Sequence, residues 1–290
     1  MAERAKTTIA TLLSWKAEGR KFPVLTCYDY STARLMEEAG IDTLLVGDTY
    51  AEVCLGHAST LPATVEHLVT LCGGVRRGAP SSFLIGDMPY LSYQINADEA
   101  IRNAGRFMVA GGCDCVKLEV DRRLAGTVEA MSRATIPVMA HLGLRPQSVH
   151  HLGGYRTQGR SAEDALRIIE DAAIMEKAGA VSLLLEAVPA EVAKIITKRT
   201  KLPVIGIAAG AEVDAQVLVM HDMLGFSSGH PPKAVKRYAN LHDTLVTAFR
   251  AYAEDVTGRE FPTESMAVHL DPEQSQKLER LLRTPHASGG

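Results

Sequence analysis

Eight short apolar segments recur along the chain, and most are followed by a polar turn and a segment patterned like an amphipathic helix. The apolar segments are nearly continuously hydrophobic, which is typical of parallel strands that are covered on both faces. They lie in the stretches FPVLTCYD, DTLLVGD, SSFLIGDMP, CVKLEV, IPVMAHLGL, VSLLLEAVP, LPVIGIAAG and QVLVMHDML. Eight strands that alternate with helices predict an α/β fold of the (β/α)8 TIM-barrel type, with a doubly wound open sheet as the alternative.

Local signals favour the barrel and suggest how the chain is divided. Asn96, with Glu99 three residues later, has the spacing of a helix N-terminus. No Gly-x-Gly-x-x-Gly motif follows the first apolar segment, which removes the usual support for a dinucleotide-binding sheet. We expect a single barrel domain over residues 1–262, with the helix in TIATLLSWKAEGR capping its bottom. Residues 263–290 are expected to form a polar tail, with a short helix in DPEQSQKLERLLR and disorder at its end.

The composition excludes several classes of function. The net charge is −3 and aromatic residues make up 5% of the chain, so neither a basic surface nor a base-stacking surface indicates nucleic acid. The same charge argues against binding to anionic membranes, and no run approaches about 18 apolar residues. Five cysteines, an odd number without zinc-site spacing, indicate reduced thiols. The protein is therefore expected to be cytoplasmic.

Charged and polar residues end most of the apolar segments, and their carboxylates outnumber the cations. They are Asp29, Asp48, Asp87, Lys117, Glu119, His141, Glu186, His221 and Asp222. In a barrel these side chains would converge at the C-terminal mouth, where the catalytic residues of this fold lie. Carboxylates that crowd one rim cannot all stay ionised unless positive charge joins them. That charge is expected to come from a divalent cation, from Lys117, or from both.

Two aspartates share a pattern that favours Mg²⁺. Asp48 in LLVGD and Asp87 in FLIGD each follow a glycine, which lets a backbone or a ligand approach closely. Mg²⁺ takes oxygen ligands from one or two carboxylates and keeps positions for water and substrate. The alternative is that each aspartate caps the following helix or pairs with a lysine or arginine.

Such a site suits the enolisation of a 2-oxo acid. A divalent cation binds the carboxylate and keto oxygens of the substrate and stabilises the enolate as a Lewis acid. The base must lie beside the α-carbon, and Glu186, which follows four residues of SLLL, is the candidate because burial would make its carboxyl more basic. Lys117 would neutralise the substrate carboxylate or the enolate oxygen. The glycine-rich stretch LGGYRTQGRS has the length of a lid.

Longer motifs resemble those of the ketopantoate hydroxymethyltransferase family over nearly the whole predicted domain. They are TCYDYSTARL, GDTYAEVCLGHASTLPATVEHL, HLGLRPQSVHHLGGYRTQGR, LLLEAVP and SGHPPKAVKRY. The resemblance implies a magnesium-dependent barrel of the phosphoenolpyruvate/pyruvate superfamily that assembles as a homo-oligomer, a decamer. It also implies transfer of a hydroxymethyl group from 5,10-methylenetetrahydrofolate to 3-methyl-2-oxobutanoate. The product is 2-dehydropantoate, an intermediate of pantothenate biosynthesis.

The resemblance also implies roles for the residues at the strand ends. Asp48, Asp87 and Glu119 would form the metal site, and Asp48 and Asp87 would also contact the substrate. The remaining substrate contacts would come from Thr49, Lys117 and His141, and Glu186 would remove the proton from C3. No motif identifies the folate site, for which Arg156 and Lys233 are the only candidates.

Several residues near the predicted mouth depart from the family pattern. Tyr50 and Glu52 stand where small residues are usual, Ala58 replaces an Asp or Asn, Val120-Asp121 replaces Gly-Gly, and Ala208 replaces a glycine. One alternative is therefore a relative that enolises another 2-oxo acid or uses another one-carbon or aldehyde partner, with Tyr50 and Val120 reshaping the pocket. Two further alternatives are a non-catalytic barrel subunit and a carbon–carbon lyase that needs no folate.

Overall fold

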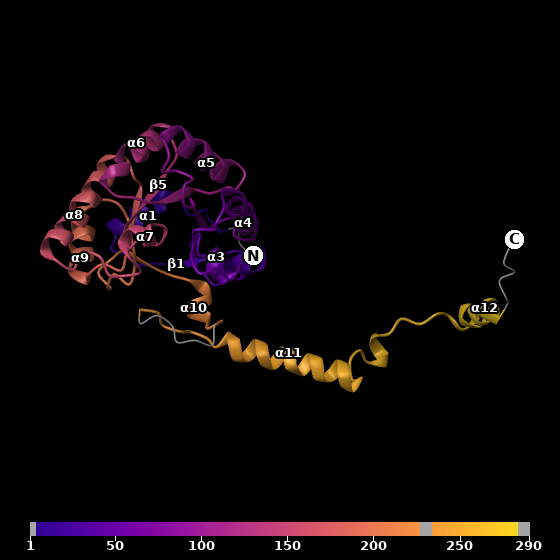
Figure 1. Cartoon of the computed structure of the whole chain (residues 1–290). Coiled ribbons are helices and arrows are strands. Elements are labelled where there is room, and N and C mark those ends of the chain that lie inside the picture. Colours follow the sequence, from indigo (N-terminus) through magenta and orange to yellow (C-terminus); the bar gives the residue numbers. More distant parts are fainter. Residues whose placement is uncertain (1–3, 227–233, 284–290) are drawn as a thin grey trace. The chain divides into compact units, whose positions relative to one another are not determined.

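The computed structural model describes residues 4–226 and 234–283. Eight parallel strands form a closed barrel, in which each strand pairs with the next and β8 pairs with β1 (Figure 1). The strands are β1 (Phe22–Thr26), β2 (Thr43–Val46), β3 (Phe83–Asp87), β4 (Cys115–Glu119), β5 (Val138–Gly143), β6 (Ser182–Glu186), β7 (Val204–Ile207) and β8 (Ala215–Leu218). The predicted (β/α)8 TIM barrel is confirmed, and the open sheet is wrong.

Helices follow the strands and surround the barrel, as the ring of α4, α5, α6, α8 and α9 in Figure 1 shows. The α-helices are α1 (Ile9–Ala17), α2 (Tyr30–Glu38), α3 (Tyr50–Val53), α4 (Val65–Gly78), α5 (Ala97–Val109), α6 (Ala125–Arg133), α7 (Val149–Leu152), α8 (Ala162–Lys177), α9 (Ala190–Arg199), α10 (Met220–Leu224), α11 (Leu241–Gly258) and α12 (Pro272–Arg283). Three short 3₁₀ helices are η1 (Arg122–Leu124), η2 (Pro146–Ser148) and η3 (Glu264–Met266). The helix start predicted at Asn96 is confirmed, since its Oδ1 accepts a hydrogen bond of 2.8 Å from the amide of Glu99.

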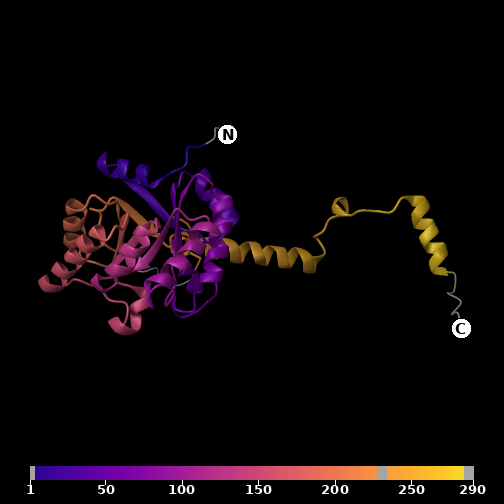
Figure 2. The ribbon, with the colours of Figure 1, turned by 90° about the horizontal axis from the view of Figure 1, so that it is seen from above.

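One apolar cluster fills the lower part of the barrel interior. Leu12 and Trp15 of α1 pack there with inward-facing strand residues such as Leu45 and Ile85. Figure 2 shows α1, in indigo, across one end of the barrel. The predicted cap at the bottom is therefore confirmed, and it leaves the opposite end of the barrel for polar residues.

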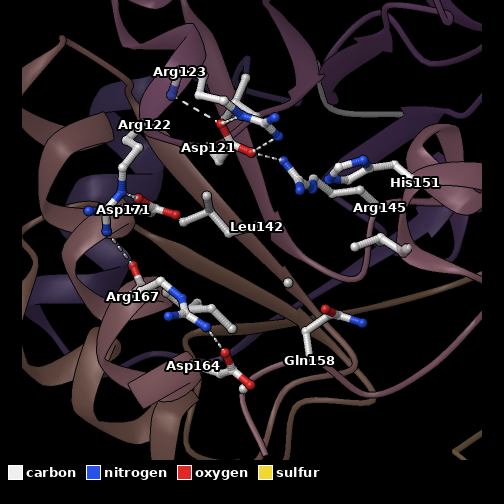
Figure 3. A pocket seen from close by; sticks show the side chains of 15 residues that line it. Asp121, Arg122, Arg123, Leu142, Arg145, His151, Gln158, Asp164, Arg167 and Asp171 are labelled. Carbon is white, nitrogen blue, oxygen red and sulfur yellow. Dashed lines mark hydrogen bonds and ion pairs between the residues drawn. The ribbon is translucent and has the colours of Figure 1, made fainter. Parts of the chain in front are cut away.

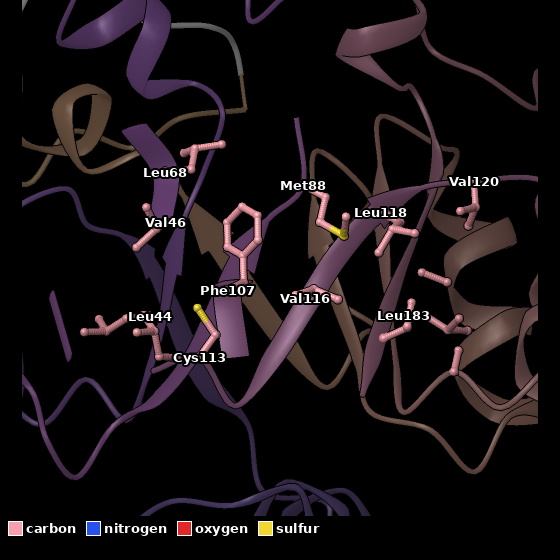
Figure 4. Packing of buried hydrophobic residues seen from close by; sticks show 14 of the residues in the cluster. Leu44, Val46, Leu68, Met88, Phe107, Cys113, Val116, Leu118, Val120 and Leu183 are labelled. Carbon is pink, nitrogen blue, oxygen red and sulfur yellow. The ribbon is translucent and has the colours of Figure 1, made fainter. Parts of the chain in front are cut away.

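A second apolar cluster lies between the outer face of the barrel and the surrounding helices. Outward-facing strand residues such as Leu44, Val116 and Leu183 pack there with helix residues that include Leu68 and Phe107 (Figure 4). Successive side chains of a strand point to opposite faces, so the two clusters take alternate residues of the same strands. Both faces of the barrel wall are thus covered, as the continuous hydrophobicity of the segments predicted.

The chain divides into two compact units, residues 1–239 and 240–290. This boundary differs from the predicted boundary between the barrel domain and the tail at residue 262. The predicted domain bounds stay a prediction. The helix predicted in the tail is present as α12, whereas the final residues 284–290, predicted to be disordered, lie outside the described residues. All five cysteines are free thiols. Among the described helices, none combines the length and the hydropathy needed to cross a bilayer.

Candidate active site

The alternation of side chains along four neighbouring strands aims polar residues into the open end of the barrel. Each lies two or four positions beyond an apolar residue of the interior cluster: Asp87 after Ile85, Lys117 and Glu119 after Cys115, His141 after Met139, and Glu186 after Leu184. Because strand residues two apart share a face, these polar side chains continue the interior of the barrel above its apolar floor. The ladder register places Asp87 beside Lys117 and Glu119 beside His141.

These side chains surround a cavity of about 90 Å³ at the C-terminal end of the barrel. All of the predicted site residues except Glu119 line it: Asp48, Thr49, Asp87, Lys117, His141 and Glu186. Glu119 is buried beside the cavity, 3.8 Å from the ring of His141. Leu45, Leu184 and Val217 supply apolar wall. The structure thus brings together every residue that the family resemblance assigns to the site. Asp29 and His221, which were also expected at the mouth, line a neighbouring cavity instead.

A buried ion pair joins β3 and β4 at the cavity. The ammonium of Lys117 donates hydrogen bonds of 2.7 Å to both carboxylate oxygens of Asp87, and both side chains are at most 6% exposed. Burial raises the pKa of Asp87 to about 7, although the ammonium of Lys117 opposes this shift. Burial lowers the pKa of Lys117, but the carboxylates of Asp87, Asp48 and Glu119 outweigh it, so the pKa is raised overall. The lysine therefore stays charged.

Asp48 lies at the turn after β2, next to this pair. Its backbone amide donates a hydrogen bond of 3.1 Å to Asp87 Oδ2, and its own Oδ2 accepts one of 2.8 Å from Gln147 Nε2. The glycine before Asp48 is required for space, since a Cβ on Gly47 would lie 2.8 Å from Thr49 Oγ1. The hydroxyl of Thr49 is held by a hydrogen bond of 2.6 Å with the hydroxyl of Tyr28.

His141 lies between two glutamates. Its Nε2 is 3.3 Å from Glu186 Oε2 and its Nδ1 is 3.8 Å from Glu119 Oε1, and neither contact has hydrogen-bond geometry. Burial and the charge of Lys117 lower the pKa of His141, so the ring is neutral near pH 7. Burial raises the pKa of Glu119 well above its usual range. The side chain of Glu186 is 23% exposed, so its carboxyl is less desolvated than the sequence predicted.

The donor set fits a hard divalent cation. Asp48, Asp87 and Glu119 are buried carboxylates, and within the described residues the one lysine or arginine bonded to any of the three is Lys117, which pairs with Asp87. Glu119 Oε1 is buried and has no hydrogen-bond partner there. No three His, Cys, Asp and Glu side chains of the described ranges form a metal centre by themselves, but Mg²⁺ needs only one or two carboxylates besides water and substrate.

Two buried residues of the site were not predicted. Gln147 is 3% exposed and bonds to Asp48, and Tyr93 is completely buried and donates a hydrogen bond of 2.8 Å to Gln147 Oε1. Gln147 lies in the motif HLGLRPQS, which marked the segment but not the direction of this side chain. Tyr93 lies on the loop after β3, where no sequence pattern signals its contacts.

The departures from the family pattern lie beside the cavity rather than in its wall. Tyr50 is buried, bonds to His67 Nδ1 at 2.8 Å and lines a neighbouring cavity of about 450 Å³. Val120 and Asp121 line a groove of about 510 Å³ next to β4 and β5, where Arg123 and Arg145 flank Asp121 (Figure 3). Neither Tyr50 nor Val120 is among the residues that line the site cavity, contrary to the alternative in which they reshape it.

No described interaction brings the two candidate folate-binding residues, Arg156 and Lys233, to the site. Lys233 lies outside the described residues, and the exposed Arg156 lies on the glycine-rich loop between α7 and α8. The aromatic side chain of Tyr155 on that loop is half exposed, and burial together with the carboxylates of Glu52 and Asp48 raises its pKa. The function of this loop as a lid stays a prediction.

Comparisons with known proteins agree with this geometry. The family model described as ketopantoate hydroxymethyltransferase matches residues 6–264. The chain is 42% identical to 3-methyl-2-oxobutanoate hydroxymethyltransferase of Koribacter versatilis (strain Ellin345), with 98% of this chain and 96% of that protein covered. It is 48% identical to the protein of the same name from Geobacillus sp. (strain WCH70), over 85% and 88% of the two chains.

Solved structures share the fold at low sequence identity. Phosphonopyruvate hydrolase superposes with a TM-score of 0.60 at 14% identity, over 97% of this chain and 99% of that chain. 2,3-Dimethylmalate lyase, a member of the PEP mutase/isocitrate lyase superfamily, superposes with a TM-score of 0.57 at 17% identity, covering 95% and 99%. These structures share the barrel fold with this chain.

Proposed function

The chain belongs to the ketopantoate hydroxymethyltransferase family, and we propose that it transfers a hydroxymethyl group from 5,10-methylenetetrahydrofolate to 3-methyl-2-oxobutanoate with the help of Mg²⁺. It is an enzyme, a hydroxymethyltransferase like its relatives, so the alternative of a non-catalytic barrel subunit is wrong. The observation that carries the proposed reaction is the cavity in which a lysine–aspartate pair, further carboxylates and Glu186 face one small space. The product would be 2-dehydropantoate, an intermediate of pantothenate biosynthesis.

The residues of the cavity divide into a cation-binding side and a base. Asp48 and Asp87, with Glu119 behind them, would hold Mg²⁺, which when bound would polarise the keto oxygen of the substrate and stabilise the charge formed on deprotonation. Lys117 provides a fixed positive charge beside Asp87 for the carboxylate of the oxo acid. The hydroxyl of Thr49, held by Tyr28, is available to the same substrate.

Glu186 is the residue best placed to take the proton from C3. Its carboxylate lines the cavity from β6, whereas the ion pair of Lys117 and Asp87 lies on β3 and β4. Its side chain is 23% exposed, and its Oε2 lies 3.3 Å from His141 Nε2. A carboxylate in this place would be the group that accepts the proton. His141, 1% exposed, lines the same cavity and would contact the oxo acid there.

Proton exchange in D2O tests this function. The protein with Mg²⁺ would be mixed with 3-methyl-2-oxobutanoate and, in parallel, with 2-oxobutanoate and pyruvate, and NMR would follow loss of the exchangeable proton signal. We expect fast exchange on the branched acid, and formation of 2-dehydropantoate once 5,10-methylenetetrahydrofolate is added. Exchange on another oxo acid alone would identify the divergent relative instead. Cleavage of a hydroxy acid without folate would identify a carbon–carbon lyase.

Binding of Mg²⁺ is expected to strengthen with pH. The pKa of Asp87 is raised to about 7, so below that pH the cation must displace a proton, whereas above it the carboxylate is already ionised. For one group with a pKa of about 7, the association constant should rise about fivefold between pH 6 and pH 7, and by about tenfold per pH unit only well below the pKa. Isothermal titration calorimetry in buffers of different ionisation enthalpy measures both the constant and the protons released. An affinity independent of pH would show that Asp87 is not a ligand.

The oligomeric state and the cellular location of the enzyme are also proposed. We propose a homo-oligomer, which family resemblance puts at a decamer. Support comes from α11, where Phe249 and Tyr252 are at least 60% exposed within the described chain. Light scattering of the purified protein measures the mass of the particle. The cytoplasmic location is proposed from the free thiols and the absence of a spanning helix among the described residues.

A further inference from the structure

We propose that Gln147 is a positioning residue of the active site, which holds the carboxylates of Asp48 and Glu119 in place for the cation. The inference rests on the proposed function, because it takes these carboxylates to be cation ligands. Gln147 is 3% exposed and does not itself line the site cavity. It therefore acts through the two carboxylates rather than on the substrate.

Gln147 contacts both carboxylates with different atoms. Its side-chain nitrogen Nε2 donates a hydrogen bond of 2.8 Å to Asp48 Oδ2, and its backbone amide donates one of 3.0 Å to Glu119 Oε2. One residue thus bonds to one oxygen of each carboxylate. Asp48 comes from the turn after β2 and Glu119 from the end of β4, so no local contact within either strand could link them.

The orientation of the Gln147 amide group is fixed by its other partners. Nε2 also donates a hydrogen bond of 3.0 Å to the backbone oxygen of Met88, so both of its protons are used. Oε1 accepts hydrogen bonds from the hydroxyl of Tyr93 at 2.8 Å and from Gln94 Nε2 at 3.3 Å. A rotation of the amide by half a turn would place Oε1 against the Asp48 carboxylate and the Met88 carbonyl, which repel it.

The backbone that carries Gln147 is tied to the strand that carries Glu119. Gln147 lies in η2, which begins with Pro146, and the preceding Arg145 forms an ion pair of 2.6 Å with Asp121. Asp121 follows Glu119 by two residues, and Figure 3 shows its carboxylate between the guanidinium groups of Arg145 and Arg123. The loops after β4 and β5 are thereby joined next to the hydrogen bond from Gln147 to Glu119.

The test measures Mg²⁺ binding to Gln147→Met, which preserves the length of the side chain. The substitution removes the side-chain hydrogen bonds to Asp48 and Met88 and keeps the backbone amide that bonds to Glu119. Groups that orient metal ligands typically change metal affinity by about 10- to 100-fold, and we expect a loss in this range by calorimetry. Proton exchange on 3-methyl-2-oxobutanoate, measured against Mg²⁺ concentration, should need correspondingly more metal but approach the wild-type rate at saturation. A residue needed only for folding would lower the rate at every Mg²⁺ concentration.

Two further variants keep the test decisive. Gln94→Met is the matched control, because Gln94 bonds to the same amide oxygen but to neither carboxylate, and its Mg²⁺ affinity should stay within about threefold of wild type. Tyr93→Phe removes one of the two partners of Oε1, together with the hydrogen bonds between this hydroxyl and the backbone of Glu119, and should weaken Mg²⁺ binding even if Gln147→Met does not fold. Wild-type affinity in both Gln147→Met and Tyr93→Phe would overturn the role of Gln147. Absence of Mg²⁺ binding by the wild-type protein would instead overturn the proposed cation site, and this role with it.

Discussion

Replacement of Glu186 by glutamine is expected to slow proton exchange at C3 of 3-methyl-2-oxobutanoate by about 10²- to 10⁴-fold, the usual contribution of a general base. The amide has nearly the shape of the carboxylate but cannot accept the proton. Glu186 is held in the fold by its backbone, which pairs with Gly143 of β5 and Ile207 of β7. The variant should therefore fold normally, and NMR in D2O isolates the loss of the base.

Glu191→Gln is the matched control for this experiment, because Glu191 is an exposed carboxylate on α9 with no part in the cavity. Its exchange rate should equal that of the wild-type protein. Mg²⁺ binding by Glu186→Gln should also be retained, since Asp48, Asp87 and Glu119 are unchanged. If Glu186→Gln exchanged the C3 proton at the wild-type rate, another group would have to be the base.

Backbone spacing made this site predictable from the sequence. The strand positions follow from the eight apolar segments, and the two-residue repeat then places Asp87, Lys117, Glu119, His141 and Glu186 on one inner face. No other information is needed to expect that their side chains meet. The capping helix was predicted from its position before the first strand, and it packs on the apolar residues of the interior.

Contacts made by loops were not predictable in the same way. Gln147 reaches Asp48 across 99 positions of the sequence, and Tyr93 reaches Glu119 across 26, through loops without periodicity. The direction of the Tyr50 side chain was not predictable either, since its sequence position beside Asp48 does not say which way it points. In the structure helix α3 directs it toward His67. Ala208, which replaces a glycine of the family, keeps the left-handed backbone at φ 51° that a glycine adopts more easily.

Replacement of Lys117 by methionine is expected to destabilise the metal-free protein by about 3–5 kcal/mol, the usual cost of removing one partner from a buried ion pair. Lys117 and Asp87 are at most 6% exposed, so water cannot take the place of the ammonium. Asp48 and Glu119 add further negative charge to the same space. Urea denaturation measures the change as a lower midpoint at unchanged slope. Lys194→Met is the control, because its ion pair with Glu212 is largely exposed and contributes at most about 1 kcal/mol.

The way in which the loss of stability in Lys117→Met changes with pH identifies its cause. The folded-state pKa of Asp87 is raised to about 7 from its usual value, so folding takes up a proton in that range and stability falls as pH rises toward 7. Lys117 lowers this pKa, so its removal raises the pKa further and extends the fall of stability above pH 7. The difference between Lys117→Met and the wild type should therefore be larger at pH 8 than at pH 6.

The double variant Lys117→Met/Asp87→Asn should be more stable than Lys117→Met alone at pH 8, because the charge left without a partner is gone. A coupling free energy of about 1–3 kcal/mol between the two substitutions is expected for groups in direct contact. Additive effects, or a loss of stability that does not change between pH 6 and 8, would mean that lost packing rather than an unpaired carboxylate destabilises the variant. Recovery in the double variant would show that the metal-free site depends on Lys117 to offset its carboxylates. That is the charge imbalance that a bound cation would relieve.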